Sequence, residues 1–162
     1  MPPLPDLVIG ALLALLGVLV AQLVAMLQAR FERQHKREIL LRTKYEELGL
    51  HFLDSMKLPG ELIQCENDEQ TRAWIHQSSA NHAQLLALVY FPLLQQATEQ
   101  YTESYSALCL AAISLYNPEV KTMLGTQVFD KPEYIVASNN HREARDNLAA
   151  KIKIHAALYA KS

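Results

Sequence analysis

Hydrophobic and polar positions are unevenly distributed along the chain, and the most apolar stretch lies near its start. Leu7 to Ala29 holds twenty-three residues without a charge, between Asp6 and Arg30. At 1.5 Å per residue, a helix of this length covers about 34 Å, slightly more than the roughly 30 Å of bilayer hydrocarbon. Apolar runs in buried helices of soluble proteins are usually shorter, about 10–14 residues. The pattern therefore predicts a membrane-spanning helix.

The residues that flank this stretch indicate whether it is retained and how it is oriented. A secretory signal peptide has a basic segment before an apolar run of about 7–15 residues, whereas here Asp6 precedes the run and no base does. We therefore expect the span to be retained. Arg30, Arg33, Lys36 and Arg37 follow it directly, and basic residues favour the cytoplasmic side. The sequence predicts a single-pass protein with its N-terminus outside.

Small residues recur on one face of the predicted span. Gly10, Ala14, Gly17 and Ala21 are spaced by four, three and four residues, which places them on the same side of a helix. Such a face lets helix backbones approach closely in lipid and favours self-association. The alternative is that the pattern reflects only the general abundance of small residues in membrane helices.

Two amide side chains break the apolar character of the span. Gln22 lies inside it and Gln28 lies close to its cytoplasmic end. A polar group facing lipid is costly, so we expect Gln22 to meet another helix or water. With one span per chain, another helix must come from a second subunit or another protein. A hydrogen-bonded contact between subunits and a water-lined pore both remain open.

Helical patterns continue through the rest of the chain. No proline interrupts residues 6–58, and Leu41, Tyr45, Leu48 and Phe52 share one helical face. We therefore predict a transmembrane helix within residues 1–29, a stalk helix over 30–58 that ends at Pro59-Gly60, and a cytoplasmic helical domain over 59–162. Within that domain, helices are predicted from about 68 or 71 to 91, from 93 to 116, from 118 to about 124 and from 132 to about 160. The predicted fold is all-α.

Charge is distributed in blocks, although the net charge is only −2. Residues 30–44 carry six bases and two acids, whereas residues 46–133 carry four bases and twelve acids. This balance argues against binding to duplex DNA. Arg33 and Arg37 on the stalk, and Arg142 and Arg145 on the last helix, are the candidate contacts for an anionic ligand. Contacts with lipid head groups, or simple solvation of a helix face, are the alternatives.

Motifs of catalysis or metal binding are not recognisable in the sequence. None of the six histidines forms an HxxxH pair, the five glycines are scattered, and no serine lies in a nucleophile-elbow motif. We therefore predict no catalytic residue, no metal site and no cofactor. Cys65 and Cys109 lack CxxC spacing and are expected to be free thiols. Tyr101 and Tyr105, four residues apart, are expected to pack against a neighbouring helix, with base stacking as the alternative.

The predicted chain consists of one span with a small-residue face, a stalk, and an all-helical tail interrupted by LVYFPLL at Leu88 to Leu94. This arrangement resembles the small single-pass effectors of bacterial anti-phage systems, such as the Hailong-type membrane effectors. The resemblance covers the chain in outline. It implies a homo-oligomer of the inner membrane that responds to a nucleotide or a single-stranded DNA signal in the cytoplasm and damages the membrane once active.

Two functions follow as hypotheses. In the first, the chain is a homo-oligomeric membrane effector whose spans form a pore or disrupt the bilayer, gated by a nucleotide or single-stranded nucleic acid at the cytoplasmic domain. In the second, it is a membrane-tethered adaptor whose helical domain docks a cytoplasmic partner protein.

Overall fold

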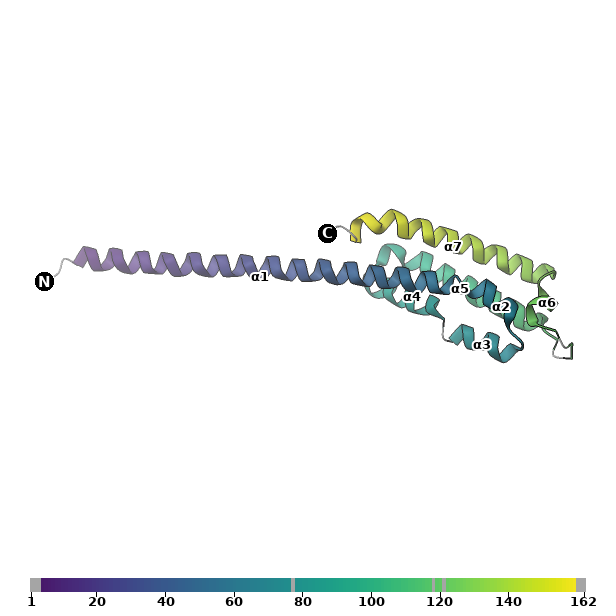
Figure 1. Ribbon diagram of the computed structural model, residues 1–162. Helices are drawn as coiled ribbons and strands as arrows, with labels where there is room; N and C mark the ends of the chain where they lie inside the picture. Colours follow the sequence, from purple (N-terminus) through teal and green to yellow (C-terminus); the bar gives the residue numbers. More distant parts are fainter. Residues whose placement is uncertain (1–3, 77, 118, 121, 160–162) are drawn as a thin grey trace. The chain divides into compact units, whose positions relative to one another are not determined.

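The computed structural model describes residues 4–76, 78–117, 119–120 and 122–159. In it, the long stretches that are free of proline and rich in helix-forming residues are long helices. The described residues form helices and no strand, so the prediction of an all-α fold is confirmed (Figure 1). The helices are α1 (Leu4–Ser55), α2 (Leu58–Gln64), α3 (Asp68–His76), α4 (Ser79–Tyr90), α5 (Pro92–Leu115), α6 (Leu124–Val128) and α7 (Pro132–Tyr159).

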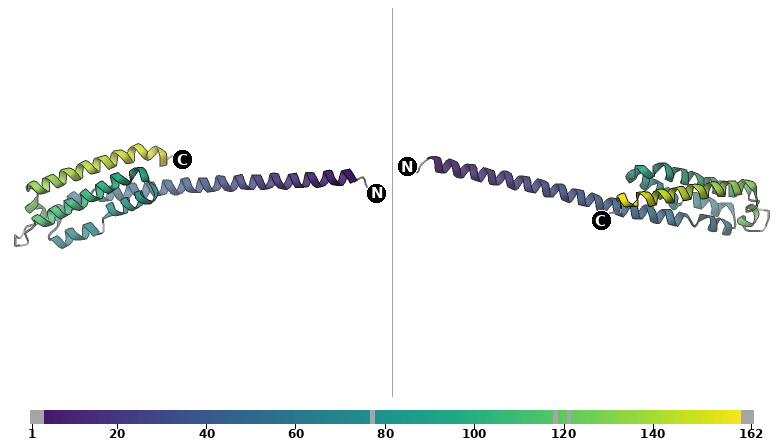
Figure 2. Two further views of the ribbon diagram at one scale, coloured as in Figure 1. Left: turned by 180° about the vertical axis from the view of Figure 1, so that it is seen from behind. Right: turned by 90° about the horizontal axis from the view of Figure 1, so that it is seen from above.

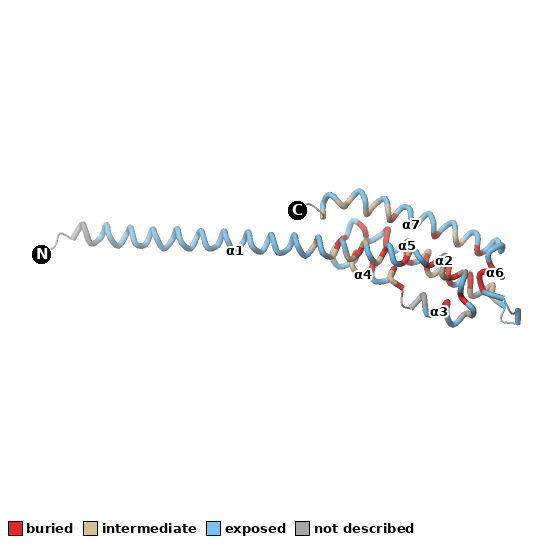
Figure 3. The backbone as a smooth tube through the Cα atoms, viewed as in Figure 1, coloured by how far each residue is buried: buried red, intermediate tan, exposed pale blue. Residues whose placement is uncertain are grey.

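The chain divides into two compact units, Met1–Leu40 and Leu41–Ser162. Helix α1 is uninterrupted across this boundary. In the first unit, every described side chain from Val8 to Leu40 is exposed, whereas the buried residues belong to the second unit (Figure 3). Among the helices of the described residues, one, α1, is long and apolar enough to cross a membrane.

The last turns of α1 pack into the second unit through the helical face that was predicted from the sequence. Tyr45, Leu48 and Phe52 are buried, and Leu41 packs beside them. The Tyr45 hydroxyl donates a hydrogen bond to the Ile152 carbonyl of α7. The last turns of α1 therefore belong to the core of the helical bundle.

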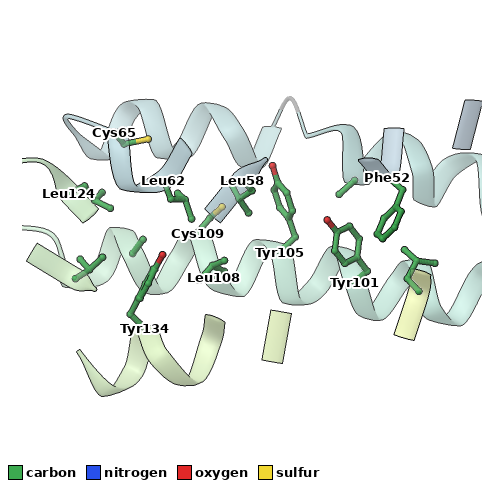
Figure 4. Close-up of a cluster of buried hydrophobic side chains, with 14 of the residues drawn as sticks. Phe52, Leu58, Leu62, Cys65, Tyr101, Tyr105, Leu108, Cys109, Leu124 and Tyr134 are labelled. Carbon is green, nitrogen blue, oxygen red and sulfur yellow. The ribbon is translucent and has the colours of Figure 1, made fainter. Parts of the chain in front are cut away.

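Two hydrophobic clusters fill that bundle. The larger one joins the end of α1, α2, α5, α6 and α7 around Tyr101, Tyr105 and Leu108, which are fully buried (Figure 4). The smaller one lies between α1, α4 and α7. There Phe91 meets Tyr45 and Tyr159 edge-on, at ring-centroid distances of 5.2 and 4.8 Å. Helices α5 and α7 lie side by side along the bundle (Figure 2).

Proline marks the start of several helices. Pro92 and Pro132 open α5 and α7, close to the predicted starts at residues 93 and 132. Proline suits the first turn of a helix because its missing N–H would have no partner there. Pro59 follows the same rule, and this corrects the prediction that Pro59-Gly60 ends the stalk helix. Helix α1 ends earlier, at Ser55, and Pro59 lies in the first turn of α2.

Two further predictions of helices were inexact. The helix expected to reach residue 91 is divided into α3 and α4, because Ser78 caps α4 by accepting a hydrogen bond from the Asn81 backbone N–H. The short helix expected from 118 to 124 begins only at Leu124. The Asn117 side chain instead accepts a hydrogen bond from the Glu119 N–H, which is an Asx turn rather than a helix cap. Pro118 itself lies outside the described residues.

Candidate functional site

The predicted packing face of the span is open along its whole length. Gly10, Ala14, Gly17 and Ala21 are all exposed. A Cβ atom added to Gly10 or Gly17 would have no neighbouring atom within 4 Å. This face has no packing partner in the described part of the chain, so any partner that it has lies outside a single molecule.

The two amide side chains of the span are exposed as well. Gln22 follows Ala21 directly and therefore lies about 100° round the helix from it. A helix that packed on the small face would accordingly have Gln22 at the flank of the contact. Gln28 lies six residues further along α1.

The four candidate arginines lie on two separate elements. Arg33 and Arg37 are exposed on α1 within the first unit. Arg142 and Arg145 belong to α7 in the second unit. Within each pair the residues are near neighbours along one helix.

The partners of Arg142 and Arg145 differ in charge. Arg142 Nη2 donates to Asn139 Oδ1 at 2.9 Å, and this amide leaves the guanidinium charge unneutralised. Arg145 donates from both Nε and Nη2 to Asp146 Oδ1, at 2.9 and 2.7 Å. Arg142 is therefore the better placed of the two to meet an external anion.

Two shallow depressions lie beside these arginines. One follows α7 and is lined by Asn139, Asn140, Arg142, Glu143, Asp146 and Asn147. The other lies between α5 and α7 and is lined by Gln100, Glu103, Ser104, Ala107, Asn140, Glu143, Ala144 and Asn147. Each lining contains three amides and two carboxylates. Amides can donate and accept hydrogen bonds at the same time.

A buried histidine lies under the depression between α5 and α7. His141 is 2% exposed, with its ring 5.1 Å from that of Tyr101 and 5.9 Å from that of Tyr105. Its Nδ1 atom lies 3.3 Å from Ser104 Oγ, and its buried Nε2 atom has no hydrogen-bond partner among the described residues. Burial, together with the charge of Arg145, lowers the pKa of His141 to about 4. The ring is therefore neutral at physiological pH.

The sequence alone does not distinguish His141, as a buried ring, from the other histidines, although a signal for its burial is present. Tyr134, His141 and Leu148 are spaced by seven residues and are the buried residues of α7. A seven-residue spacing keeps side chains on one helical face. The two tyrosines against this histidine were predicted to pack against a neighbouring helix, and this is confirmed because both are fully buried.

Residue clusters suited to catalysis or metal binding are not evident in the described part of the chain. No three His, Cys, Asp or Glu side chains gather there around a position for a metal ion. Cys65 and Cys109 are both buried and form no disulfide. Burial raises the pKa of the Cys109 thiol to about 12, which makes it a poor nucleophile.

Comparisons with known proteins give no family. No protein-family model matches the chain, and no curated protein and no solved structure is significantly similar to it.

Proposed function

We propose that the chain is a homo-oligomeric, single-pass membrane effector that forms a pore in the inner membrane or disrupts it, as the resemblance to anti-phage effectors implies. The N-terminus lies outside and the second unit lies in the cytoplasm. The observation that carries this proposal is the exposure of the long apolar segment of α1, from residue 8 to residue 29.

The amount of exposed apolar surface on α1 supports a lipid environment. Thirteen large apolar side chains between residues 8 and 27 are exposed: Val8, Ile9, Leu12, Leu13, Leu15, Leu16, Val18, Leu19, Val20, Leu23, Val24, Met26 and Leu27. Burying one such side chain stabilises by about 1.5–3 kcal/mol, so the set represents roughly 20–40 kcal/mol. This exceeds the roughly 5–15 kcal/mol that stabilises a typical domain. A bilayer covers such a surface on all sides.

The small-residue face supports assembly of several copies. Lipid covers apolar side chains as well as another helix does, so spans associate through close backbone packing and hydrogen bonds. Gly10 and Gly17 allow that approach, since no atom of the described residues lies within 4 Å of a Cβ added at either position. Gln22, at the flank of such a contact, then faces a neighbouring subunit or a water-filled path.

The gating ligand in this proposal is a nucleotide or a single-stranded nucleic acid bound at α7. Arg142 supplies a positive charge for a phosphate, and Asn139, Asn140 and Asn147 supply amides for the edges of a base. Arg145 is a secondary contact because it already holds Asp146. On the first unit, Arg33 and Arg37 supply exposed charges for an anionic ligand or for lipid phosphates.

Membrane potential in bacteria tests this proposal, measured with a voltage-sensitive dye during induced expression of the full chain. The wild-type chain is expected to depolarise the cells. Gly17→Leu is expected to remove most of this effect, since a Cβ at this position meets no atom of the described residues within 4 Å and the added side chain therefore acts on contacts between molecules. Leu19→Phe adds bulk on the opposite side of the helix and serves as the matched control. A Gly17→Leu chain as active as wild type would overturn the proposal. A wild-type chain that inserts without changing the potential would overturn it as well if it also passes no current in a planar bilayer supplied with a single-stranded oligonucleotide.

A further inference from the structure

Helix α4 packs with its small residues inside and its large ones outside. Its buried residues are Ala80, Ala83 and Ala87. Leu85, Leu88 and Val89 on the other side are 58%, 57% and 60% exposed. A helix at the surface of a soluble domain normally turns its large apolar residues inward. The second half of α4, residues 85–90, is apolar all round, which is typical of a helix that is covered on both sides.

A groove accompanies this outer side. It lies between α4 and α5 and is lined by Asn81, Gln84, Leu85, Leu88, Gln95 and Glu99. We define the α4 face as this lining together with Val89. Leucines form its apolar centre, and amides with one carboxylate form its border, which is the layout of a protein–protein interface.

The charge of this region indicates what covers it. Residues 73–98 contain no Asp, Glu, Lys or Arg. In a two-fold interface each residue meets the same surface on the other molecule, so any charge near the axis would face its own copy. The apolar centre of the face, Leu85, Leu88 and Val89, carries no charge and avoids that repulsion, and its one carboxylate, Glu99, belongs to the border. The amides of the border pair with one another because they both donate and accept. The face is therefore complementary to itself.

We infer that the α4 face binds the α4 face of a second copy of this chain in the membrane-anchored oligomer. This inference rests on the proposed function for the choice of occupant, because spans that assemble hold the cytoplasmic units of identical chains at high effective concentration. It adds a second, cytoplasmic contact to the one within the bilayer.

Cross-linking of the full chain in native membranes tests this contact. Leu85→Cys, Leu88→Cys and Val89→Cys each place one thiol on the face, and the native Cys65 and Cys109 are buried. With a short bis-maleimide, at least one of the three variants is expected to give the homodimer. Val136→Cys on α7 is the control, since Val136 is equally exposed at 58%.

A charge exchange verifies that the face itself makes the contact. Leu88→Asp, introduced into the Leu85→Cys chain, is expected to lower dimer yield about tenfold or more, and so is Leu88→Lys. Co-expression of the two charged chains is expected to restore the yield. Because Leu88 is exposed, neither substitution disturbs the core. Misfolded chains would not regain the dimer when co-expressed, so a restored yield would show that each single substitution had removed only the contact.

Failure of this inference is distinguishable from failure of the proposed oligomer. Ala14→Cys, oxidised to a disulfide between spans, reports assembly in the bilayer independently. If Ala14→Cys chains cross-link and none of the three α4 variants exceeds Val136→Cys, the inference is overturned and the oligomer stands. If neither region cross-links, both are overturned. Adducts of another mass at the α4 positions would indicate a different protein partner and would also overturn the inference.

Discussion

Replacing His141 by phenylalanine removes a buried ionisable ring while keeping an aromatic side chain against Tyr101. Ser104, the hydrogen-bond partner of His141, keeps a second bond because its hydroxyl donates to the Tyr101 carbonyl at 2.7 Å. The variant therefore leaves the packing between α5 and α7 close to that of wild type. The change that we expect concerns how stability depends on pH.

The sign and size of this effect follow from the lowered pKa. In the unfolded chain, His141 titrates near 6.5, whereas in the folded chain its pKa is about 4. Between these values the unfolded chain binds a proton that the folded chain excludes. The folded state is therefore fully stabilised above about pH 6.5 and loses stability as the pH falls towards 4. At pH 5 the loss due to this one group is about 2 kcal/mol.

Urea unfolding of the full chain in a mild detergent measures this loss. The near-ultraviolet circular dichroism of the tyrosines is the suitable signal because Tyr101 and Tyr105 lie in the core of the second unit. Between pH 7.5 and pH 5.0, the free energy of unfolding of wild type should fall by about 2 kcal/mol more than that of His141→Phe. Other titrating groups cancel in this difference. Equal pH dependence of the two proteins would refute the account of His141 as a buried, neutral ring.

Three further predictions concern the core, the ligand and the orientation. Phe91→Ala should lower the free energy of unfolding of the second unit by about 3–5 kcal/mol because Phe91 is fully buried. The control Leu93→Ala, at an exposed site, should lower it by less than about 1 kcal/mol, and urea unfolding measures both variants. Arg142→Gln should weaken binding of a single-stranded oligonucleotide and reduce the magnitude of the slope of log affinity against log salt concentration by about 0.7. The control Lys131→Gln should leave the affinity and this slope unchanged, and fluorescence anisotropy measures both. A fluorescent protein fused to the C-terminus should fluoresce and alkaline phosphatase fused there should be inactive, because the bases after the span favour a cytoplasmic tail.

Local patterns predicted the long elements of this fold well. The face of Leu41, Tyr45, Leu48 and Phe52 was visible as a spacing, and the same residues line the core. Helix α5 was evident from its length without proline or glycine. Such features depend on residues within a few turns of one another, so the sequence expresses them directly.

Other features depend on partners far apart in the chain. His141 is buried because Tyr101, forty residues earlier, packs on its ring. The inward side of α4 likewise depends on distant partners, since Ala83 and Ala87 pack in one cluster with Tyr45 of α1. A proline can open a helix as readily as end one, so Pro59 alone did not reveal which of the two it does. Contacts of this kind appear only when the helices are placed in space.

The electric current across a planar bilayer that contains the purified full chain tests the central claim most directly. We predict discrete current steps, whose size changes in Gln22→Leu while the number of subunits per assembly stays the same. Single-stranded oligonucleotide is supplied on the side of the second unit, since the proposed pore opens on binding it. A bilayer in which subunit counting shows assembled chains, but in which the current stays at baseline for both proteins with this ligand present, would contradict a pore formed by the spans.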